Sequence, residues 1–377
     1  MKWKIVTDSS CDWALESPAC AVSSVPFVIS AGDEDFVDDA ALQVPAMLDA
    51  MERCEMASHT SCPTPQAWLE EFEQADRCIA ITISSRLSGS MNSAQIAREL
   101  ALERAPEKRI AVLDSRYTGP EIALCVEAMQ GWIAQGMDFE GVVRAAGRFL
   151  QKTHIAFALS SFDNLIKNGR MSRAVGFLAH KLGMWGIGAG SDEGEIAVRG
   201  KTRGPWRAIG MLIAEMQEKG FCGGRVAIDH CCNPDFAEKL RAKILEHWEN
   251  ARVSIHPTRG LCGYYAQRHG VIVRMAAPVD AALARPGQAS FQPEEADPQL
   301  FALFRAQMQA QQNGGRKPQK TQSHPRGAGE EQNGGQRTQI RNTRAVKIGA
   351  HAQHQRKEKE EKRQGLERRI RGEAQPQ

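Results

Sequence analysis

Hydroxyl groups gather in one short turn of this chain. The segment Ile83–Ser90 (ISSRLSGS) follows an apolar, β-branched run and precedes apolar residues at helical spacing. That order is typical of a strand that turns into a helix. The unpaired N–H groups at a helix N-terminus favour a carboxylate or a phosphate, and the serines add neutral donors. The turn therefore predicts a site for a small anionic group, although the turn taken alone is better explained by Ser88 as a helix cap.

Three other hydroxyl-bearing turns occur along the chain, and two of them follow predicted strands. They contain Thr60-Ser61, Asp8-Ser9-Ser10 and Asp114-Ser115. In doubly wound sheets, ligands bind where strands end and helices begin, so we expect these turns at one edge. Thr60 and Ser88 would then donate to the two oxygens of one carboxylate, and each such hydrogen bond is worth roughly 1.5–3 kcal/mol. Asp8 is expected to bond to hydroxyl groups of these loops rather than to the ligand.

The chain lacks the residues that several other kinds of site require. The chain has no GxGxxG, no P-loop lysine after its serine-rich turn and no GxSxG, so nucleotide binding and α/β-hydrolase chemistry are not indicated. His230-Cys231-Cys232 is the one metal-like cluster, and adjacent side chains rarely converge on one tetrahedral ion. We predict no metal and no cofactor.

Strands and helices alternate along most of the chain. Thr64 before Pro65 is a strong helix start. The repeated order of strand then helix predicts an α/β fold with parallel or mostly parallel sheets covered on both faces. The predicted strands are Trp3–Thr7, Val22–Ile29, Cys78–Ser84, Arg109–Leu113, Ile155–Leu159, Trp185–Gly190, Glu195–Arg199, Arg225–Asp229, Val253–His256 and Val271–Arg274. The predicted helices are Pro45–Arg53, Ala67–Gln74, Met91–Leu100, Ile122–Gln135, Phe139–Leu150, Ser161–Lys167, Ser172–Leu182, Pro205–Lys219, Pro234–Trp248 and Leu261–Arg268.

Composition separates a globular body from a tail. The chain has 377 residues, enough for two domains, and 42% of them are apolar. From residue 313 onward, 16 Lys/Arg face 7 Asp/Glu, whereas the preceding residues carry a net charge of −6. Apolar residues are few there, so we expect a disordered tail. Clustered cations attract nucleic acid, but no aromatic residue stands among them to stack on bases, so we predict no nucleic-acid partner.

The start of the chain and its apolar runs indicate where in the cell the protein is expected. A predicted strand begins at Trp3, and no apolar run approaches the roughly 20 residues that span a bilayer. We therefore expect a cytoplasmic protein with no signal peptide and no integral membrane segment.

The motifs, taken in chain order, resemble the signatures of the DegV family. They are Asp8–Ser10, Thr60–Pro65, Ile83–Ser90, Val112–Ser115 and Leu165–Ser172, and the resemblance runs from about Lys2 to Val273. It implies two α/β domains with a long-chain fatty acid buried between them. On that basis we expect an N-terminal domain at 1–158 that carries the carboxylate-binding loops. A second domain at 159–275 would cover the acyl chain, and a basic tail would occupy 276–377.

The family resemblance also implies a function and a partner. Bacterial members of the family serve as the binding subunit of a two-part fatty acid kinase. They present the acyl carboxylate to a separate ATP-dependent catalytic subunit. The chain is therefore expected to be a lipid-binding carrier and not itself an enzyme, with a long-chain fatty acid as its ligand.

Residues matching the family motifs are assigned to the head group of that ligand. Thr60 and Ser88 match the hydroxyl groups that hold the carboxylate, with Ser61 and Gly89 beside them. His256 matches a histidine near the carboxylate, although a histidine at a strand end can also be purely structural.

Two basic residues also match positions near the head group or the kinase-docking face. They are Arg170 and Arg203. Arg170 could instead cap a helix C-terminus, and Arg203 could be a solvated surface residue.

Two functions from other classes remain open. A hydrolase or acyltransferase would use Ser88 or Ser61 as nucleophile and His256 as base, and it requires a Ser88–His256 contact of about 3 Å. A nucleic-acid-binding protein would depend on the basic tail.

Overall fold

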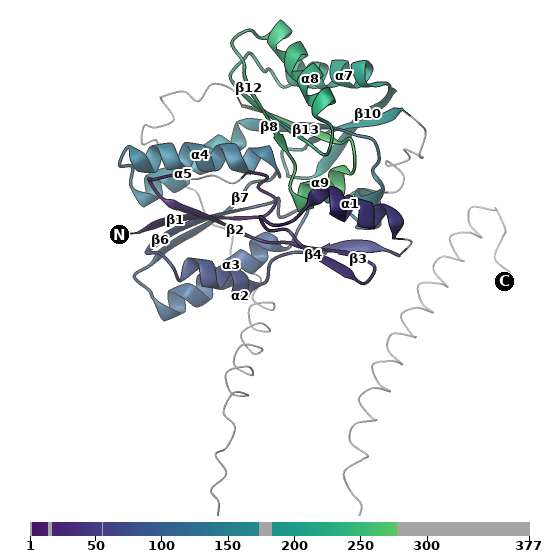
Figure 1. Ribbon diagram of the computed structural model, residues 1–377. Coiled ribbons are helices and arrows are strands. Elements are labelled where there is room, and N and C mark those ends of the chain that lie inside the picture. Colours follow the sequence, from purple (N-terminus) through teal and green to yellow (C-terminus); the bar gives the residue numbers. More distant parts are fainter. Residues whose placement is uncertain (1, 14–16, 55, 173–182, 277–377) are drawn as a thin grey trace, which may run out of the picture. The chain divides into compact units, whose positions relative to one another are not determined.

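The computed structural model describes residues 2–13, 17–54, 56–172 and 183–276, which belong to one compact unit of the chain (Figure 1). Apart from Ser172 and Ala276, the predicted helix at 172–182 and the predicted tail at 276–377 lie outside the described residues. Below, the N-terminal part means the described residues up to Gln151, and the C-terminal part means those from Lys152 to Ala276.

The N-terminal part is built on a parallel sheet of order β2-β1-β6-β7. Helices α2 and α3 cover one face of this sheet, and α4 and α5 cover the other (Figure 1). The strands are β1 (Trp3–Asp8), β2 (Ala21–Val25), β6 (Arg77–Thr82) and β7 (Arg109–Asp114). The helices are α2 (Pro65–Phe72), α3 (Ser90–Arg104), α4 (Pro120–Ala134) and α5 (Phe139–Gln151).

Side chains that point alternately to the two faces of each strand explain why helices cover both faces of the sheet. Val6, Ala80 and Val112 pack with α2 and α3. Their neighbours Ile5 and Leu113 pack with α4 and α5. Successive side chains of a strand point to opposite faces, so a strand that is apolar throughout needs helices on both sides. The parallel, doubly covered sheet predicted from the sequence is confirmed here.

The start of α2 also follows the prediction. Thr64 is the N-cap, and its hydroxyl oxygen accepts a hydrogen bond from the N–H of Ala67 at 3.3 Å. Pro65 occupies the first helical turn, where its missing N–H costs nothing.

A small antiparallel sheet of order β4-β3-β5 was not foreseen as such. Its strands are β3 (Val28–Ala31), β4 (Glu34–Val37) and β5 (Ser58–Ser61), and helix α1 (Val44–Arg53) lies between β4 and β5 in the chain. Thr60 pairs with Ile29 in this sheet. Strand β5 is short and polar, so no apolar alternation marks it in the sequence. Backbone pairing with β3 nevertheless holds Thr60 in a defined place.

The C-terminal part contains a six-stranded sheet of order β10-β9-β8-β13-β11-β12. Only the β11–β12 pair is parallel, and all other neighbours are antiparallel. The prediction of mostly parallel sheets therefore holds for the first sheet and is wrong for this one. Strands β9 and β10 form a hairpin, and β13 enters between β8 and β11. The strands are β8 (Thr153–Leu159), β9 (Met184–Gly190), β10 (Ile196–Arg203), β11 (Arg225–His230), β12 (Arg252–Pro257) and β13 (Val271–Ala276).

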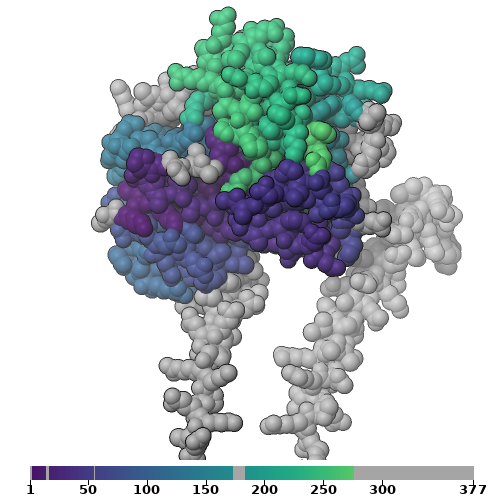
Figure 2. Space-filling model, in the orientation of Figure 1, coloured from purple at the N-terminus to yellow at the C-terminus, as the bar shows by residue number. Residues whose placement is uncertain are grey.

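Strand β8 shows how this sheet presents two different faces. Ala156 and Ala158 pack against α7 (Pro205–Glu218) and α8 (Pro234–His247). Phe157 and Leu159 lie on the opposite face, with α6 (Asp163–Lys167) and α9 (Gly260–Ala266). This second face is apolar and turned toward the N-terminal part. Figure 2 shows the teal and green C-terminal part lying against the purple and blue N-terminal part.

The change from one sheet to the next falls between α5 and β8. Since β8 begins at Thr153, the second sheet starts before the predicted domain boundary at 158. The division into two domains at that residue stays a prediction.

A buried ion pair ties the two parts together. The Nε of Arg274 on β13 lies 2.6 Å from Oε2 of Glu121 on α4, and both side chains are fully buried. The hydroxyl of Thr153 donates to the same carboxylate, and the Arg274 guanidinium lies 4.8 Å from the ring centre of Phe149. Burial raises the pKa of Glu121, and the Arg274 charge opposes that shift.

Breaking this pair should be costly. In Arg274→Met, Glu121 would be buried without its cation, and the free energy of unfolding should fall by about 3–5 kcal/mol. The double variant Glu121→Leu/Arg274→Met should be less destabilised than Arg274→Met, because no charge stays buried. Urea unfolding measures both. As a control, Lys243→Met removes one partner of the exposed Lys243–Glu246 pair and should cost less than about 1 kcal/mol. Equal, small effects for both single variants would contradict the prediction.

Candidate functional site

An apolar cavity lies where the turns of the N-terminal part meet the inner face of the second sheet. Its empty volume is about 840 Å³, the mouth included. Its apolar lining comes from both parts and includes Phe27, Ile83, Leu87, Phe157, Leu165 and Ile272.

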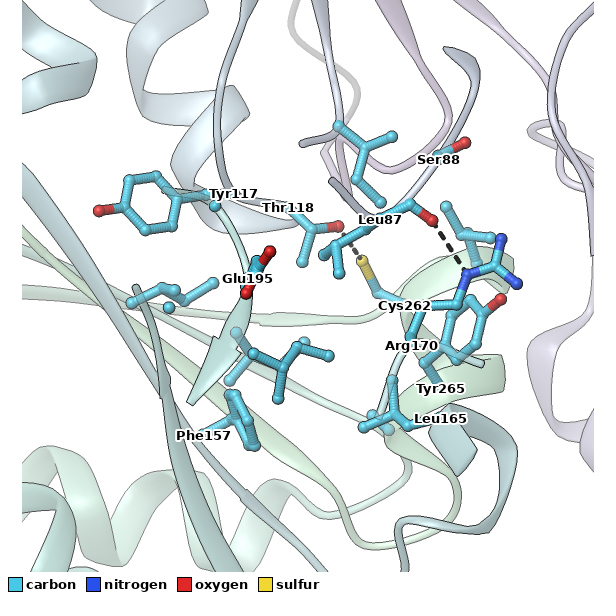
Figure 3. Close-up of a pocket in the computed structure, with 18 of the residues that line it drawn as sticks. Leu87, Ser88, Tyr117, Thr118, Phe157, Leu165, Arg170, Glu195, Cys262 and Tyr265 are labelled. Atoms are coloured by element: carbon cyan, nitrogen blue, oxygen red, sulfur yellow. Dashed lines mark hydrogen bonds between the residues drawn. The ribbon is translucent and has the colours of Figure 1, made fainter. Parts of the chain in front are cut away.

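One end of the cavity is polar. Ser88, Arg170 and Tyr265 gather at this end in Figure 3, and Tyr117 and Glu195 lie toward the other. Thr60 lines the same cavity. Thr60 and Ser88 are both half-buried, so the polar end reaches the surface.

The hydroxyl groups of Thr60 and Ser88 each have a neighbour in the protein. The Thr60 Oγ1 lies 2.9 Å from the Tyr265 hydroxyl. The Ser88 Oγ accepts a hydrogen bond from the N–H of Ser90 at 3.3 Å. The N-cap of α3 is Gly89, so Ser88 is not the capping residue. Because its oxygen accepts, the Ser88 hydroxyl proton is left for a ligand.

Asp8 holds the serine-rich turn from behind. Its fully buried carboxylate accepts hydrogen bonds from the N–H of Ile83 at 3.0 Å and from the hydroxyl of Ser90 at 2.6 Å. Ser10 donates to it through both its N–H and its hydroxyl. Burial raises the pKa of Asp8, and these hydrogen bonds oppose the shift. The expectation that Asp8 bonds to loop hydroxyl groups is confirmed, and the result is a turn of fixed shape.

Arg170 reaches the polar end from the segment after α6. Its Nε donates to the carbonyl of Leu87 at 2.9 Å, and its Nη1 donates to the carbonyl of Asn168 at 2.7 Å. Its guanidinium carbon lies 5.8 Å from the ring centre of Tyr265. Arg170 thus binds the residue that precedes Ser88 and also caps the end of its own helix, as the capping interpretation expects. Its contact with a ligand head group or a kinase stays a prediction.

Three other residues assigned from the sequence do not line the cavity. Ser61 is exposed and follows Thr60 on β5, so its side chain points to the opposite face of that strand. Gly89 is exposed at the start of α3, and Arg203 is exposed at the end of β10. Their roles stay predictions.

His256 also lies outside the cavity lining. It is on the edge strand β12, and its ring centre lies 3.8 Å from that of Trp13. Its Nε2 is buried and has no hydrogen-bond partner among the described residues. Burial lowers the pKa of His256. Within the described part of the chain, no hydrogen bond joins it to Ser88, so the serine–histidine pair of a hydrolase lacks its defining contact.

The sequence did not point to Tyr265, which is 205 residues from Thr60 along the chain. No motif marks it, because a tyrosine in an apolar helix usually fills a core. Only the packing of α9 against β5 brings the two hydroxyl groups together.

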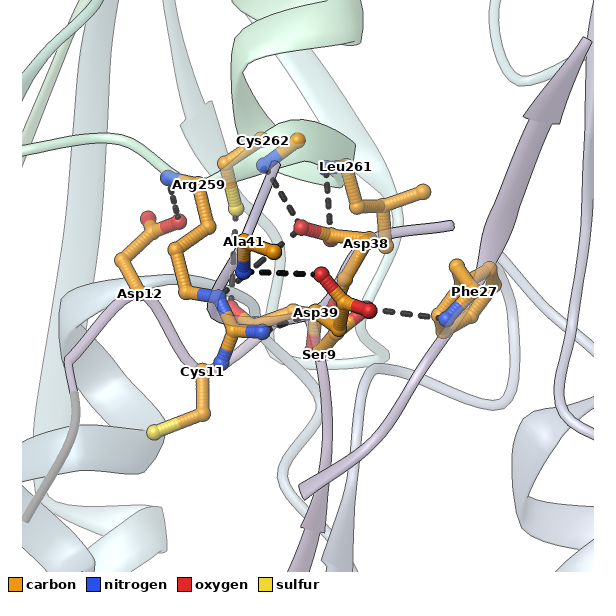
Figure 4. Close-up of polar contacts among 12 residues, drawn as sticks. Ser9, Cys11, Asp12, Phe27, Asp38, Asp39, Ala41, Arg259, Leu261 and Cys262 are labelled. Carbon is orange, nitrogen blue, oxygen red and sulfur yellow. Dashed lines mark hydrogen bonds and ion pairs between the residues drawn. The ribbon is translucent and has the colours of Figure 1, made fainter. Parts of the chain in front are cut away.

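Helix α9 is anchored to the N-terminal part by a buried aspartate. Asp38 accepts hydrogen bonds from the N–H groups of Gly260 and Leu261, each at 2.8 Å (Figure 4). Arg259 adds a bond from its side chain to the Asp38 carbonyl at 2.7 Å. Cys262 and Tyr265, which follow on this helix, line the cavity. Asp38 therefore fixes where the helix presents them.

A second buried contact joins the two parts through a pair of carboxyl groups. Asp12 and Asp229 are both buried and their carboxyl groups are close enough to interact, which favours a proton on one of them. Asp12 also accepts from the N–H of Arg259 at 2.7 Å, and Asp229 from the indole of Trp13 at 3.1 Å. Burial raises the pKa of Asp12 to about 6. Burial and the Asp12 charge raise the pKa of Asp229 well above its ordinary value.

This pair predicts a specific pH dependence of stability. Because both pKa values are raised above 3.8, the folded state binds more protons than the unfolded chain. The stability from the pair is then fully present below about pH 4 and is lost as the pH rises through about 6. Asp229→Asn should flatten this fall, since an amide donates to Asp12 at every pH. Urea unfolding of both proteins between about pH 4 and 7 measures the difference. Parallel curves for the two proteins would contradict it.

The described residues show neither a metal-binding cluster nor a membrane-spanning helix. They contain no group of three or more His, Cys, Asp or Glu side chains arranged to hold a metal ion. None of their helices combines the length and the apolar character needed to cross a membrane.

Fold and site together define an α/β binding protein with a buried apolar cavity and a hydroxyl-lined end. The family model for "Uncharacterised protein, DegV family" matches residues 2–272. The chain therefore belongs to the DegV family, as the resemblance of its motifs indicated. A DegV domain-containing protein of Streptococcus pneumoniae is 37% identical over 276 residues, which cover 72% of this chain and 98% of the relative.

Solved structures show the same fold with fatty acids bound. The Streptococcus pneumoniae Fatty Acid Kinase (Fak) B3 protein loaded with linoleic acid has 37% identity and a TM-score of 0.71 and matches 73% of this chain and 99% of its own. A DegV family protein from Eubacterium eligens loaded with heptadecanoic acid has 36% identity, a TM-score of 0.70 and the same coverage of both chains.

Proposed function

We propose that this chain binds a long-chain fatty acid, with the carboxylate held by Thr60 and Ser88 and the acyl chain in the cavity. The observation that carries the proposal is the cavity itself. It is apolar along its length and has two hydroxyl groups from separate segments, with Arg170 beside them, at one end. The fatty acids carried by the two structures named above support this ligand class.

The chemistry of the lining matches such a ligand at both ends. Each CH₂ removed from water contributes roughly 0.8 kcal/mol, so burial of the acyl chain supplies most of the affinity. The hydroxyl donors fix the head group, since hydrogen bonds to a charged acceptor are the stronger kind. Arg116 lines the opposite end, but it is exposed and donates to the carbonyl of Asp192. The carboxylate therefore belongs at the Thr60–Ser88 end.

The protein then acts as a carrier whose chemistry is done by a partner. The polar end reaches the surface at the half-buried Ser88 and the exposed Gly89, so a bound carboxylate would be within reach of a second protein. The chain has no P-loop to hold ATP. The similar Streptococcus pneumoniae Fatty Acid Kinase (Fak) B3 protein supports an ATP-dependent fatty acid kinase subunit as that partner. Arg203 stays a candidate for its docking surface. A cytoplasmic location is part of the proposal, because an ATP-dependent partner would draw on the ATP of the cytoplasm.

Loss of either hydroxyl should weaken fatty acid binding. Thr60→Val and Ser88→Ala each remove one hydrogen bond to the carboxylate, and affinity should fall about tenfold or more. Displacement of a fluorescent fatty acid from delipidated protein measures it. Arg116→Gln, at the other end of the same cavity, is the matched control and should change affinity less than about twofold. A loss confined to Arg116→Gln would mean that the fatty acid binds in the reverse direction.

Mass spectrometry of lipid extracted from the purified wild type should find a long-chain acid.

Acyl phosphate formation tests the carrier role. Fatty acid, ATP and the catalytic subunit of a fatty acid kinase should give acyl phosphate only when this chain is present. Thr60→Val should slow the reaction, because the carboxylate is no longer held toward the partner. Thin-layer chromatography with labelled fatty acid follows the product. An equal rate without this chain would contradict the carrier role.

A further inference from the structure

The hydroxyl of Thr60 is useful to a carboxylate only if its single proton points into the cavity. A threonine hydroxyl has one proton and two lone pairs. Its partner at 2.9 Å is the Tyr265 hydroxyl, and the distance alone does not say which of the two donates. If Thr60 donated to Tyr265, its proton would be lost to the ligand. The identity of the donor therefore decides whether Thr60 can bind a carboxylate.

The surroundings make Tyr265 the donor. A phenol is more acidic than an aliphatic alcohol, so it is the better donor of the two. The Arg170 guanidinium, 5.8 Å from the ring centre, draws electron density from the ring. Burial raises the pKa of Tyr265, so its hydroxyl stays protonated at neutral pH. Among the described residues, Thr60 is the one hydrogen-bond partner of the Tyr265 side chain.

We propose that Tyr265 is a positioning residue, whose hydroxyl donates to the Thr60 Oγ1 and thereby directs the Thr60 proton onto the ligand carboxylate. The inference rests on the proposed fatty acid binding and adds a residue to that site. Ser88 has the matching arrangement, because its oxygen accepts from the N–H of Ser90. Each ligand-facing hydroxyl thus has one lone pair filled by the protein, and its proton remains for the carboxylate.

The neighbouring residue Tyr264 offers a matched control. Its hydroxyl lies 2.9 Å from the hydroxyl of Ser58 and accepts from the Asn168 amide at 2.9 Å. Tyr264 is fully buried on the same helix and does not line the cavity. Tyr264→Phe therefore removes at least as many hydrogen bonds as Tyr265→Phe, without touching the proposed head-group site.

The deciding measurement compares palmitic acid with hexadecan-1-ol, which has the same chain and no carboxylate. Displacement of a fluorescent fatty acid from delipidated protein gives the affinity for each. Tyr265→Phe should bind the acid about three- to tenfold more weakly and the alcohol within about twofold of wild type. Tyr264→Phe should leave both affinities within about twofold, although thermal unfolding should show it to be the less stable variant.

A double-mutant cycle tests whether Tyr265 acts through Thr60. In a Thr60→Val background, Tyr265→Phe should cause no further loss of palmitic acid affinity. A further loss there, or equal losses for acid and alcohol in the single variant, would overturn the positioning role. Failure of the wild type to prefer the acid over the alcohol would be a different result. It would overturn the proposed head-group site itself, and this inference with it.

Discussion

Buried carboxylates must find donors, and three of those in the N-terminal part find them on the C-terminal part. Asp38 accepts from the start of α9, Asp12 from the N–H of Arg259, and Glu121 from Arg274. An unpaired buried charge would cost several kcal/mol, so these contacts fix how the two parts meet to within the length of a hydrogen bond. The shape of the cavity between the two parts is fixed by the same contacts.

Hydrogen bonds to buried polar groups also hold the proposed head-group site in place. Asp8 holds the turn that carries Ser88, and β3 holds the strand that carries Thr60. Arg170 bonds to the backbone before Ser88 and lies over Tyr265, which contacts Thr60. Hydrogen bonds within the protein therefore hold the two hydroxyl groups, which lie on separate segments, at one spacing. A preorganised site of this kind binds with little loss of conformational entropy.

The apolar face of the second sheet that lines the cavity is a product of strand alternation. On β8, small alanines face α7 and α8, which lets the helices pack closely, and larger apolar residues face the cavity. Such a face would be exposed to water if the N-terminal part did not cover it. One apolar surface thus serves both to bring the two parts together and to line the cavity, which is why the cavity forms at their contact.

The sequence determined the local elements and the family. Apolar runs predicted the strands of the parallel sheet, and Thr64-Pro65 predicted the start of α2, because these signals are local. The hydroxyl-rich segments likewise contain Thr60 and Ser88, which line the cavity. Tertiary structure alone decided the rest. The direction of strands in the second sheet depends on which strand inserts where, and β5 exists only because β3 pairs with it. Whether a matched motif residue faces the cavity, as Thr60 does and His256 does not, depends on packing between residues far apart in the chain. No local pattern records that packing, and for the same reason Tyr265 emerged only from the fold.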